Sequence, residues 1–440
     1  MNIRDRQILR IAIPSIVSNI TVPLLGLVDV TITGHLGAAA YIAAISIGSM
    51  VFNTIYWLFG FLRMGSSGLT SQALGRRDLQ EVAMWLVRGL LIAMGIALML
   101  ILVQWPVREV ALWIMHPGEE VRQMVVTYFH ICIWGAPAVL GLYTMNGWFI
   151  GMQNSRIPMA VAITQNIVNI LVSLLLVFGL HMKVEGVALG TLVAQWVGFL
   201  MACALCRHFY GKRLRDVASL SRDNVIVIML FRHREIKRFF QINRDIFLRT
   251  LCLVSVMLFF TSAGSWQGEV ILAVNTLLMQ MYLLVSYVMD GFANAAEAMS
   301  GKYWGANNKV ALRQTIMHCF LWGAACTTLF TLLYIIGGDA FLCLLTDEPS
   351  VVSASYDYVW WIWLIPISSM AAFIWDGVFI GISASRQMLV SSFCSATVFF
   401  AVYLSTVGAM HNHGLWLAFI CFMLTRGIAQ TILFVRENRG

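Results

Sequence analysis

Long apolar runs separated by short polar segments are the dominant pattern along this chain. Each run holds 18 or more mostly uncharged residues, enough for a helix that crosses the roughly 30 Å hydrocarbon core of a bilayer. The predicted spans are residues 11–33, 38–62, 81–103, 124–147, 157–180, 184–206, 239–262, 270–296, 311–336, 353–378, 388–408 and 414–435. The alternating ten-residue pattern of a membrane β-barrel is absent. The pattern predicts an all-α integral membrane protein with twelve transmembrane helices.

The composition and the placement of charge agree with this class. Hydrophobic residues make up 60% of the 440 and charged residues 11%, against about 25% charged residues in a soluble domain. Of the 29 Lys and Arg, only Arg108, Arg122 and Lys183 fall on odd-numbered loops. Because basic loops stay cytoplasmic, we expect both termini in the cytoplasm of a multi-pass protein of the bacterial inner membrane. This alternation explains the net charge of +8 without a nucleic-acid partner.

The two halves of the chain are copies of one unit. GWFIGMQNSR (147–156) and GVFIGISASR (377–386) match at six of ten places, 230 positions apart. We predict an N-terminal six-helix bundle (1–206), a basic cytoplasmic linker (207–238) lying against anionic lipid, and a C-terminal six-helix bundle (239–440). Six is even, so the pseudo-two-fold axis that relates the bundles should run along the membrane normal.

Two glycine pairs recur at equivalent places in the copies. Gly147 and Gly151 lie four apart near the cytoplasmic end of span 4, as do Gly377 and Gly381 near that of span 10. Small residues at this spacing let helices approach closely in lipid. We interpret both pairs as packing positions within a bundle rather than as gates.

Asp29 is the one charged residue between Ile11 and His35. An ionised carboxylate at the middle of a membrane helix costs about 2.5–3.5 kcal/mol or more. Keeping the group neutral at pH 7 costs about 4 kcal/mol, since an ordinary Asp titrates near pH 3.9. The two states are close in energy, so burial or contact with water can tip the balance. Asp29 is therefore our candidate for a proton-coupling group, and Thr33, one turn later, could hydrogen-bond to it.

The second bundle has acids of its own in its spans. Asp290 and Glu297 lie seven apart on one face of span 8, and Asp376 lies in span 10. Arg63 in span 2 is the basic residue deepest in the corresponding region of the first bundle. Two alternatives remain open: a cation-binding cluster in a cavity, or ion pairs that lock the bundles together. Glu297, near the cytoplasmic end, could simply be hydrated.

Aromatic and thioether side chains suit a pocket for varied lipophilic cations, because they are polarisable and adaptable. Tyr143, Met145, Trp148 and Met279 are the candidates to line such a cavity. Membrane helices are rich in these residue types in any case, so packing is the competing interpretation.

Several stretches of the chain resemble the DNA-damage-inducible F branch of the multidrug and toxic compound extrusion (MATE) transporters. They include NITVPLLGLVDVTITGHLG (19–37), FLRMGSSGLTSQALG (61–75), MDGFANAAEAMSGKYWGA (289–306) and DGVFIG (376–381). The resemblance runs along essentially the whole chain. It implies two six-helix bundles that form a V-shaped cavity, and export of organic compounds in exchange for protons or sodium ions.

The resemblance also assigns roles to residues of the first bundle. It implies that an acid in the first helix, here Asp29, is the coupling group, with Pro14 and Pro23 as plausible hinges of that helix. Asn166 and Asn169 match polar positions of the family's fifth helix. Ser173 stands where the family usually has a second acid, and this departure favours a proton over sodium.

We therefore predict a proton-driven antiporter, a monomer, that exports organic cations or amphiphiles by alternating access. The alternatives are a sodium-coupled exporter and a lipid-intermediate flippase, which would need several mid-span cations for pyrophosphate; such cations look scarce in the sequence. We expect no enzyme activity and no cofactor. His411 and His413 lack a third ligand nearby, so we expect no metal site.

Overall fold

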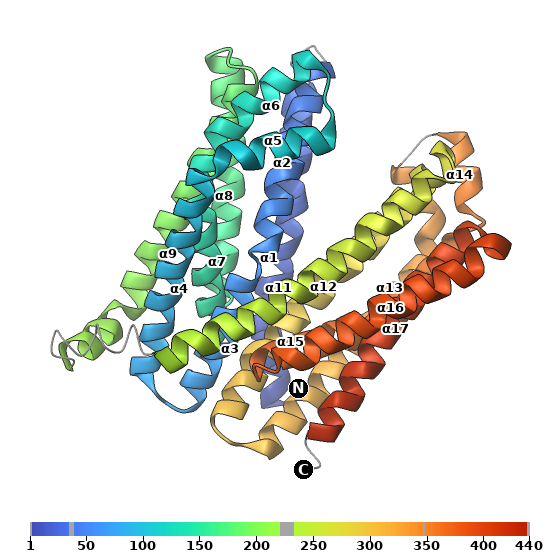
Figure 1. Cartoon of the computed structure of the whole chain (residues 1–440). Helices are drawn as coiled ribbons and strands as arrows, with labels where there is room; N and C mark the ends of the chain where they lie inside the picture. The colour runs from blue at the N-terminus through green and yellow to red at the C-terminus, as the bar shows by residue number, and fades with distance from the viewer. Residues whose placement is uncertain (1, 35–38, 221–232, 346–347, 438–440) are drawn as a thin grey trace. The chain divides into compact units, whose positions relative to one another are not determined.

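The computed structural model describes residues 2–34, 39–220, 233–345 and 348–437. At some helical positions, among them 22–27, 29, 30 and 33, it describes the backbone alone. Every regular element in these ranges is a helix (Figure 1). The fold is all-α, as the sequence predicts.

The helices of the first half begin with α1, a single helix of 32 residues. They are α1 (Ile3–Gly34), α2 (Ala39–Leu58), α3 (Phe61–Gly75), α4 (Leu79–Leu102), α5 (Gln104–Met115), α6 (Glu119–Cys132), α7 (Ala136–Gly151), α8 (Arg156–Leu174) and α9 (Val184–Leu220). A 3-10 turn joins α6 to α7, and α8 ends in a π-helical turn.

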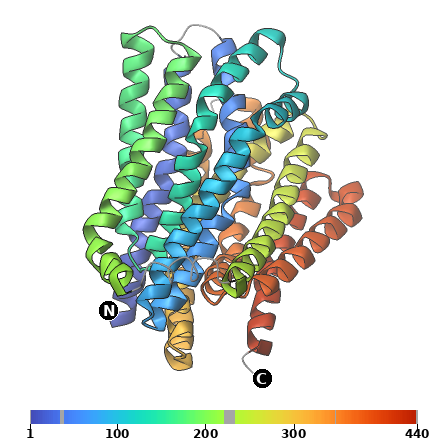
Figure 2. The ribbon, with the colours of Figure 1, turned by 60° about the vertical axis from the view of Figure 1, so that its left-hand side comes forward.

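The second half repeats this order with longer continuous helices. They are α11 (His233–Ser265), α12 (Glu269–Gly305), α13 (Lys309–Leu345), α14 (Pro349–Ser355), α15 (Val359–Gly381), α16 (Ser385–Met410) and α17 (Asn412–Glu437). Neighbours in sequence lie side by side, for example α8 with α9 and α16 with α17 (Figure 1, Figure 2).

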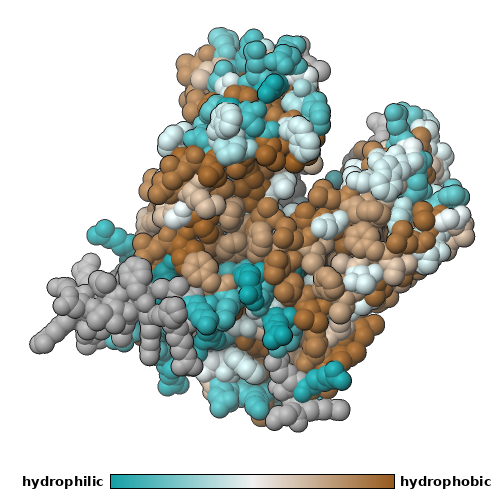
Figure 3. Space-filling view, in the orientation of Figure 1, coloured by the Kyte–Doolittle hydropathy of each residue, from teal (hydrophilic) through white to brown (hydrophobic). Residues whose placement is uncertain are grey.

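Eleven segments within the described residues are long and apolar enough to cross a membrane. With α1 they give the twelve spans that the sequence predicts. On the face shown in Figure 3, apolar side chains cover much of the middle of the helices, and hydrophilic side chains gather toward their ends. This is the surface of a protein whose solvent at mid-height is lipid.

The chain divides into two compact units, and the division starts inside α1. One unit holds residues 1–16 with 238–440, and the other holds 17–237. The bounds predicted for the two bundles stay a prediction; by their contacts, residues 1–16 group with 238–440. Within the predicted linker 207–238, α9 continues to Leu220 and α11 begins at His233. A helical backbone need not end where the apolar run ends.

The glycine pairs pack as expected, and they pack alike in both units. A Cβ atom on Gly147 would overlap the carbonyl oxygen of Arg63, and one on Gly377 would overlap that of Ala293. Arg63 and Ala293 are themselves 230 positions apart. The prediction of close helix packing within each bundle is confirmed, between α3 and α7 and between α12 and α15.

Candidate functional site

The unit formed by residues 17–237 holds a polar cluster on α1, α8 and α9. The Asn166 side-chain amide donates a hydrogen bond to the carbonyl oxygen of Thr21 on α1, at 2.7 Å. Asn169, fully buried, donates to the hydroxyl of Thr191 on α9, at 3.1 Å. Its Oδ1 atom accepts no hydrogen bond within the part of the chain that the structure describes. The cluster therefore holds one buried hydrogen-bond acceptor, the Asn169 Oδ1 atom, that could accept a further hydrogen bond.

Ser173 lies one turn of α8 beyond Asn169 and is buried against α9. A Cβ atom on Gly190 would overlap the Ser173 hydroxyl, and that hydroxyl has no hydrogen-bond partner among the described residues. The close approach of α9 leaves little room for a longer side chain at either position. Packing here fits serine better than a second carboxylate.

Asp29 lies on α1 about two helical turns after Thr21, the residue that Asn166 contacts. The side chains of Asp29, Thr33 and Pro23 fall outside the described residues, so their predicted roles stay predictions. Pro14 is buried on the same helix, two residues before the division between the units. A proline interrupts the helical hydrogen-bond ladder, so this position suits the predicted hinge.

We call residues 17–237 the first unit and residues 1–16 with 238–440 the second unit. The second unit holds a buried charged network around Asp376 on α15. Its Oδ2 atom accepts hydrogen bonds from Arg249 on α11 and from Arg426 on α17, the latter at 2.6 Å. Its Oδ1 atom accepts one from Gln430 on α17, at 2.6 Å. The exposed fractions are 7% for Asp376, 5% for Arg249, 4% for Arg426 and 0% for Gln430. One carboxylate thus joins three helices of one unit.

This network bears on the two alternatives that the sequence left open for Asp376. Both of its oxygens already accept hydrogen bonds, and two guanidinium groups repel a further cation. All donors belong to the same unit, so these ion pairs connect helices within it. The contacts favour a structural role within the bundle over either a cation site or a lock between bundles.

Arg249, Arg426 and Gln430 were not among the predicted site residues. Mid-span cations look scarce in the sequence, but this unit holds two of them, Arg249 and Arg426. Arg249 lies ten residues inside the predicted span 239–262, and Arg426 lies inside 414–435. An arginine in the middle of an apolar run was the signal, because such a charge needs a buried partner.

The other predicted acids lie on α12 in different surroundings. Asp290 is half-buried and interacts electrostatically with Arg249, so it belongs to the edge of the network. Glu297 is 1% exposed, which contradicts the idea that it is simply hydrated. In the first unit, Arg63 and Tyr143 are both half-buried and interact electrostatically with each other.

The predicted cavity-lining residues differ in how they are packed. Trp148 is buried and donates its indole N–H to the carbonyl oxygen of Val82, at 2.9 Å. Met145 is also buried, with its sulfur 3.7 Å from that of Cys203 on α9. Both side chains contribute to helix packing in the first unit. Met279 is half-buried on α12.

No group of three His, Cys, Asp or Glu that could hold a metal ion occurs among the residues described. His413 accepts a hydrogen bond from the indole of Trp361, at 3.1 Å, and packs on the ring of Tyr358. These contacts make His413 a packing residue at the start of α17.

A duplicated set of membrane helices with buried ionisable groups defines a class of protein, the secondary transporters. A family model described as MatE matches residues 14–175 and 246–404, one segment in each repeat. The chain belongs to this family, the multidrug and toxic compound extrusion transporters. It is a multi-pass membrane transporter and not an enzyme.

Individual relatives agree with this assignment. The chain is 33% identical to the DNA damage-inducible protein F of Escherichia coli K12, over 99% of this chain and 93% of the relative. It is 22% identical to a probable multidrug resistance protein NorM of Acinetobacter baylyi, over 99% and 96%. The predicted resemblance to the DNA-damage-inducible F branch is thus confirmed.

Solved structures of MATE proteins share the fold. A MATE protein in the bent conformation superposes with a TM-score of 0.85 at 18% identity, covering 99% of this chain and 96% of that one. A MOP superfamily transporter from Pyrococcus furiosus, described as having a binding pocket of reverse polarity, gives 0.83 at 18%, over 99% and 96%.

Proposed function

We propose that this protein is a proton-driven antiporter of the bacterial inner membrane, with both termini in the cytoplasm. It exports organic cations or amphiphiles by alternating access between its two bundles, and Asp29 is the proton-coupling group. The observation that carries the proposal is the polar cluster on α1, α8 and α9. Within its described part it offers amide and hydroxyl groups and no second carboxylate.

The chemistry of this cluster supports a proton as the coupling ion. A protonated carboxyl group is a hydrogen-bond donor and needs an acceptor, whereas a carboxylate only accepts. Asn169 has a free buried acceptor, its Oδ1 atom, in the same cluster. A sodium site built from two carboxylates would need an acid near Ser173, where α9 packs closely.

A second candidate function is movement of a lipid-linked anionic headgroup, as the flippase alternative requires. Arg249 and Arg426 favour it, because they place two cations inside the second bundle. Both are already bonded to Asp376, however, which compensates one of the two charges, and Asp290 interacts electrostatically with Arg249. We therefore keep export of organic compounds as the main proposal.

The test is transport of a fluorescent organic cation into liposomes that contain the purified protein. A pH gradient should drive transport, a sodium gradient alone should not, and Asp29→Asn should abolish the response to the pH gradient. Glu120→Gln is the control, because it removes an exposed acidic charge that lies outside the predicted spans. Wild-type transport by Asp29→Asn would refute the role of Asp29, and transport driven by sodium alone would favour the sodium-coupled alternative.

A further inference from the structure

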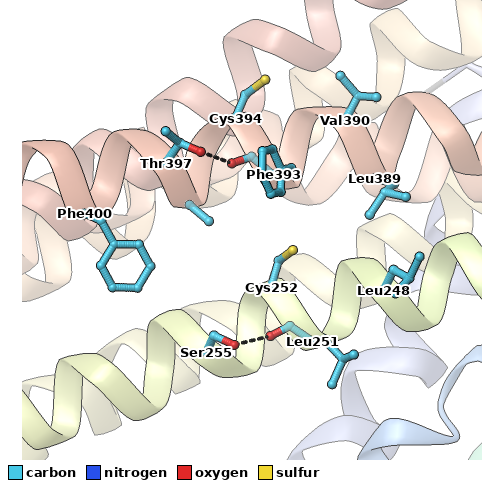
Figure 4. A pocket seen from close by; sticks show the side chains of 11 residues that line it. Leu248, Leu251, Cys252, Ser255, Leu389, Val390, Phe393, Cys394, Thr397 and Phe400 are labelled. Carbon is cyan, nitrogen blue, oxygen red and sulfur yellow. Dashed lines mark hydrogen bonds between the residues drawn. The ribbon is translucent and has the colours of Figure 1, made fainter.

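An apolar groove runs between α11 and α16 in the C-terminal unit (Figure 4). Its volume is about 740 Å³, and its walls include Leu248 and Leu251 from α11 and Leu389, Phe393 and Ala396 from α16. The size lies in the range of small-molecule sites, about 300–1,000 Å³. Both walls belong to spans, so the groove lies at membrane depth.

The internal repeat shows how the walls of this groove differ from the corresponding helices of the first half. Ala396 and Leu251 correspond to Asn166 and Thr21, each 230 positions earlier. In the first unit the Asn166 amide donates to the Thr21 carbonyl oxygen and so bridges α8 to α1. Alanine has no group that can make this bridge, and the two helices of the second unit leave a channel between them.

A polar contact joins the same two helices beyond one end of the groove. The Ser385 hydroxyl at the start of α16 donates to Oδ2 of Asp245 on α11, at 3.0 Å, and both residues are buried. Arg244, whose side chain is 68% exposed, bonds the other oxygen of Asp245 at 3.0 Å. Arg386, next to Ser385, is exposed and has no ion pair with any residue that the structure describes.

The two arginines lie on the same helix faces as the walls of the groove. Arg244 precedes Leu248 by four residues and Arg386 precedes Leu389 by three, and residues at these spacings are neighbours on a helix surface. Two exposed arginines, of which Arg244 is paired with Asp245, thus lie near one end of an apolar channel and leave it a net positive charge. The distribution of charge along the chain predicts that this end faces the cytoplasm, where the leaflet carries anionic lipid.

We infer that the groove binds an anionic phospholipid, with one acyl chain between α11 and α16 and the phosphate group at Arg244 and Arg386. An apolar groove alone selects nothing in a bilayer, because lipid tails are as apolar as the helices. Selectivity comes from the arginines, which hold the headgroup, and from the shape of the channel, which accommodates the chain. This goes beyond the transport function and does not depend on the identity of its coupling ion.

The test is native mass spectrometry of the full-length protein with phosphatidylglycerol or phosphatidylcholine of identical chains. Wild type should retain phosphatidylglycerol preferentially. Arg244→Gln and Arg386→Gln should each lower that retention about fivefold and leave phosphatidylcholine unchanged. Arg156→Gln is the matched control, because Arg156 is exposed at the equivalent place in the first unit.

Two further variants probe the groove itself. Ala396→Trp should fill the groove and lower the retention of both lipids. Ala396→Asn is a smaller change; it should also lower the retention of both lipids, because it restores the hydrogen bond that joins the two helices in the first unit. Equal retention of both lipids by wild type would overturn the inference, as would an equal effect of Arg156→Gln and Arg386→Gln. Displacement of the lipid by a fluorescent organic cation, abolished in Ala396→Trp, would show instead that the groove is a substrate site.

Discussion

Replacing Asp376 with Asn would leave two guanidinium groups in the interior of the C-terminal unit without their carboxylate. Arg249 and Arg426 are both at least nine-tenths buried, so water cannot take the place of that partner. Removing one partner of a buried ion pair typically destabilises a protein by about 3–5 kcal/mol. The Gln430 amide can still donate to the oxygen of Asn, so the loss concerns the charge rather than every hydrogen bond.

The size of the effect should depend on which member of the network is removed. Arg426→Ala takes away one of the two cations and leaves Arg249 paired with Asp376. Its expected cost is about 1.5–3 kcal/mol, the contribution of a hydrogen bond to a charged group. Asp290→Asn is the comparison, because that acid is only half-buried and lies at the edge of the network.

The measurement is unfolding of the purified protein by sodium dodecyl sulfate in mixed micelles, followed by circular dichroism. The expected order of destabilisation is Asp376→Asn, then Arg426→Ala, then Asp290→Asn. If Asp376→Asn unfolds within about 1 kcal/mol of wild type, the network is not the buried ion pair that we describe. A larger loss for Arg426→Ala than for Asp376→Asn would contradict the reasoning about uncompensated charge.

Two further predictions concern packing and pH. Gly377→Ala should lower the free energy of unfolding by about 1–3 kcal/mol, because the new methyl group overlaps a carbonyl oxygen of α12. Gly408→Ala is the control: a Cβ atom there meets no atom within 4 Å, so this variant should not be destabilised in the same assay. A hydrogen bond from His318, at 2.8 Å, is the main cause that lowers the pKa of Asp5. The ionised carboxylate therefore stabilises the fold above its ordinary pKa of about 3.9, and this contribution is lost as the pH falls through the lowered value. Thermal unfolding should separate wild type from Asp5→Asn at neutral pH and not in strong acid; a gap that persists in acid would count against this assignment.

Much of the architecture followed from the amino-acid pattern. The number of spans, the duplication and the close packing at Gly147 and Gly377 were all predicted, because each depends on a local or periodic property of the chain. A helix in lipid must be apolar over a fixed length, and a close helix contact needs small residues at a fixed spacing. The end of a helix is different: α9 and α11 continue past their apolar runs, since hydropathy marks the edge of the lipid and not the end of the backbone hydrogen bonds.

The charged network in the second unit could not be predicted in the same way. Asp376 is 127 residues from Arg249 and 50 residues from Arg426. In the sequence, each looks like an unpaired charge in an apolar helix, which is unfavourable in a membrane. Only the packing of α11, α15 and α17 brings the opposite charges together. The same limit applies to Ala396. Only the packing of the helices shows that Ala396 and Leu251 line one groove, at the places where Asn166 and Thr21 are bridged in the first unit.

By itself, the sequence determined the class of this protein and its repeated plan, and it supplied the prediction that Asp29 carries the proton. Those conclusions rest on the free energy of moving single residues into lipid, which depends on residue type and depth. Tertiary structure decided which buried charges compensate each other, where the division between the units falls in α1, and which pair of helices leaves a groove. These features depend on contacts between residues far apart in the chain, and the energies of such contacts cannot be judged from any single stretch of sequence.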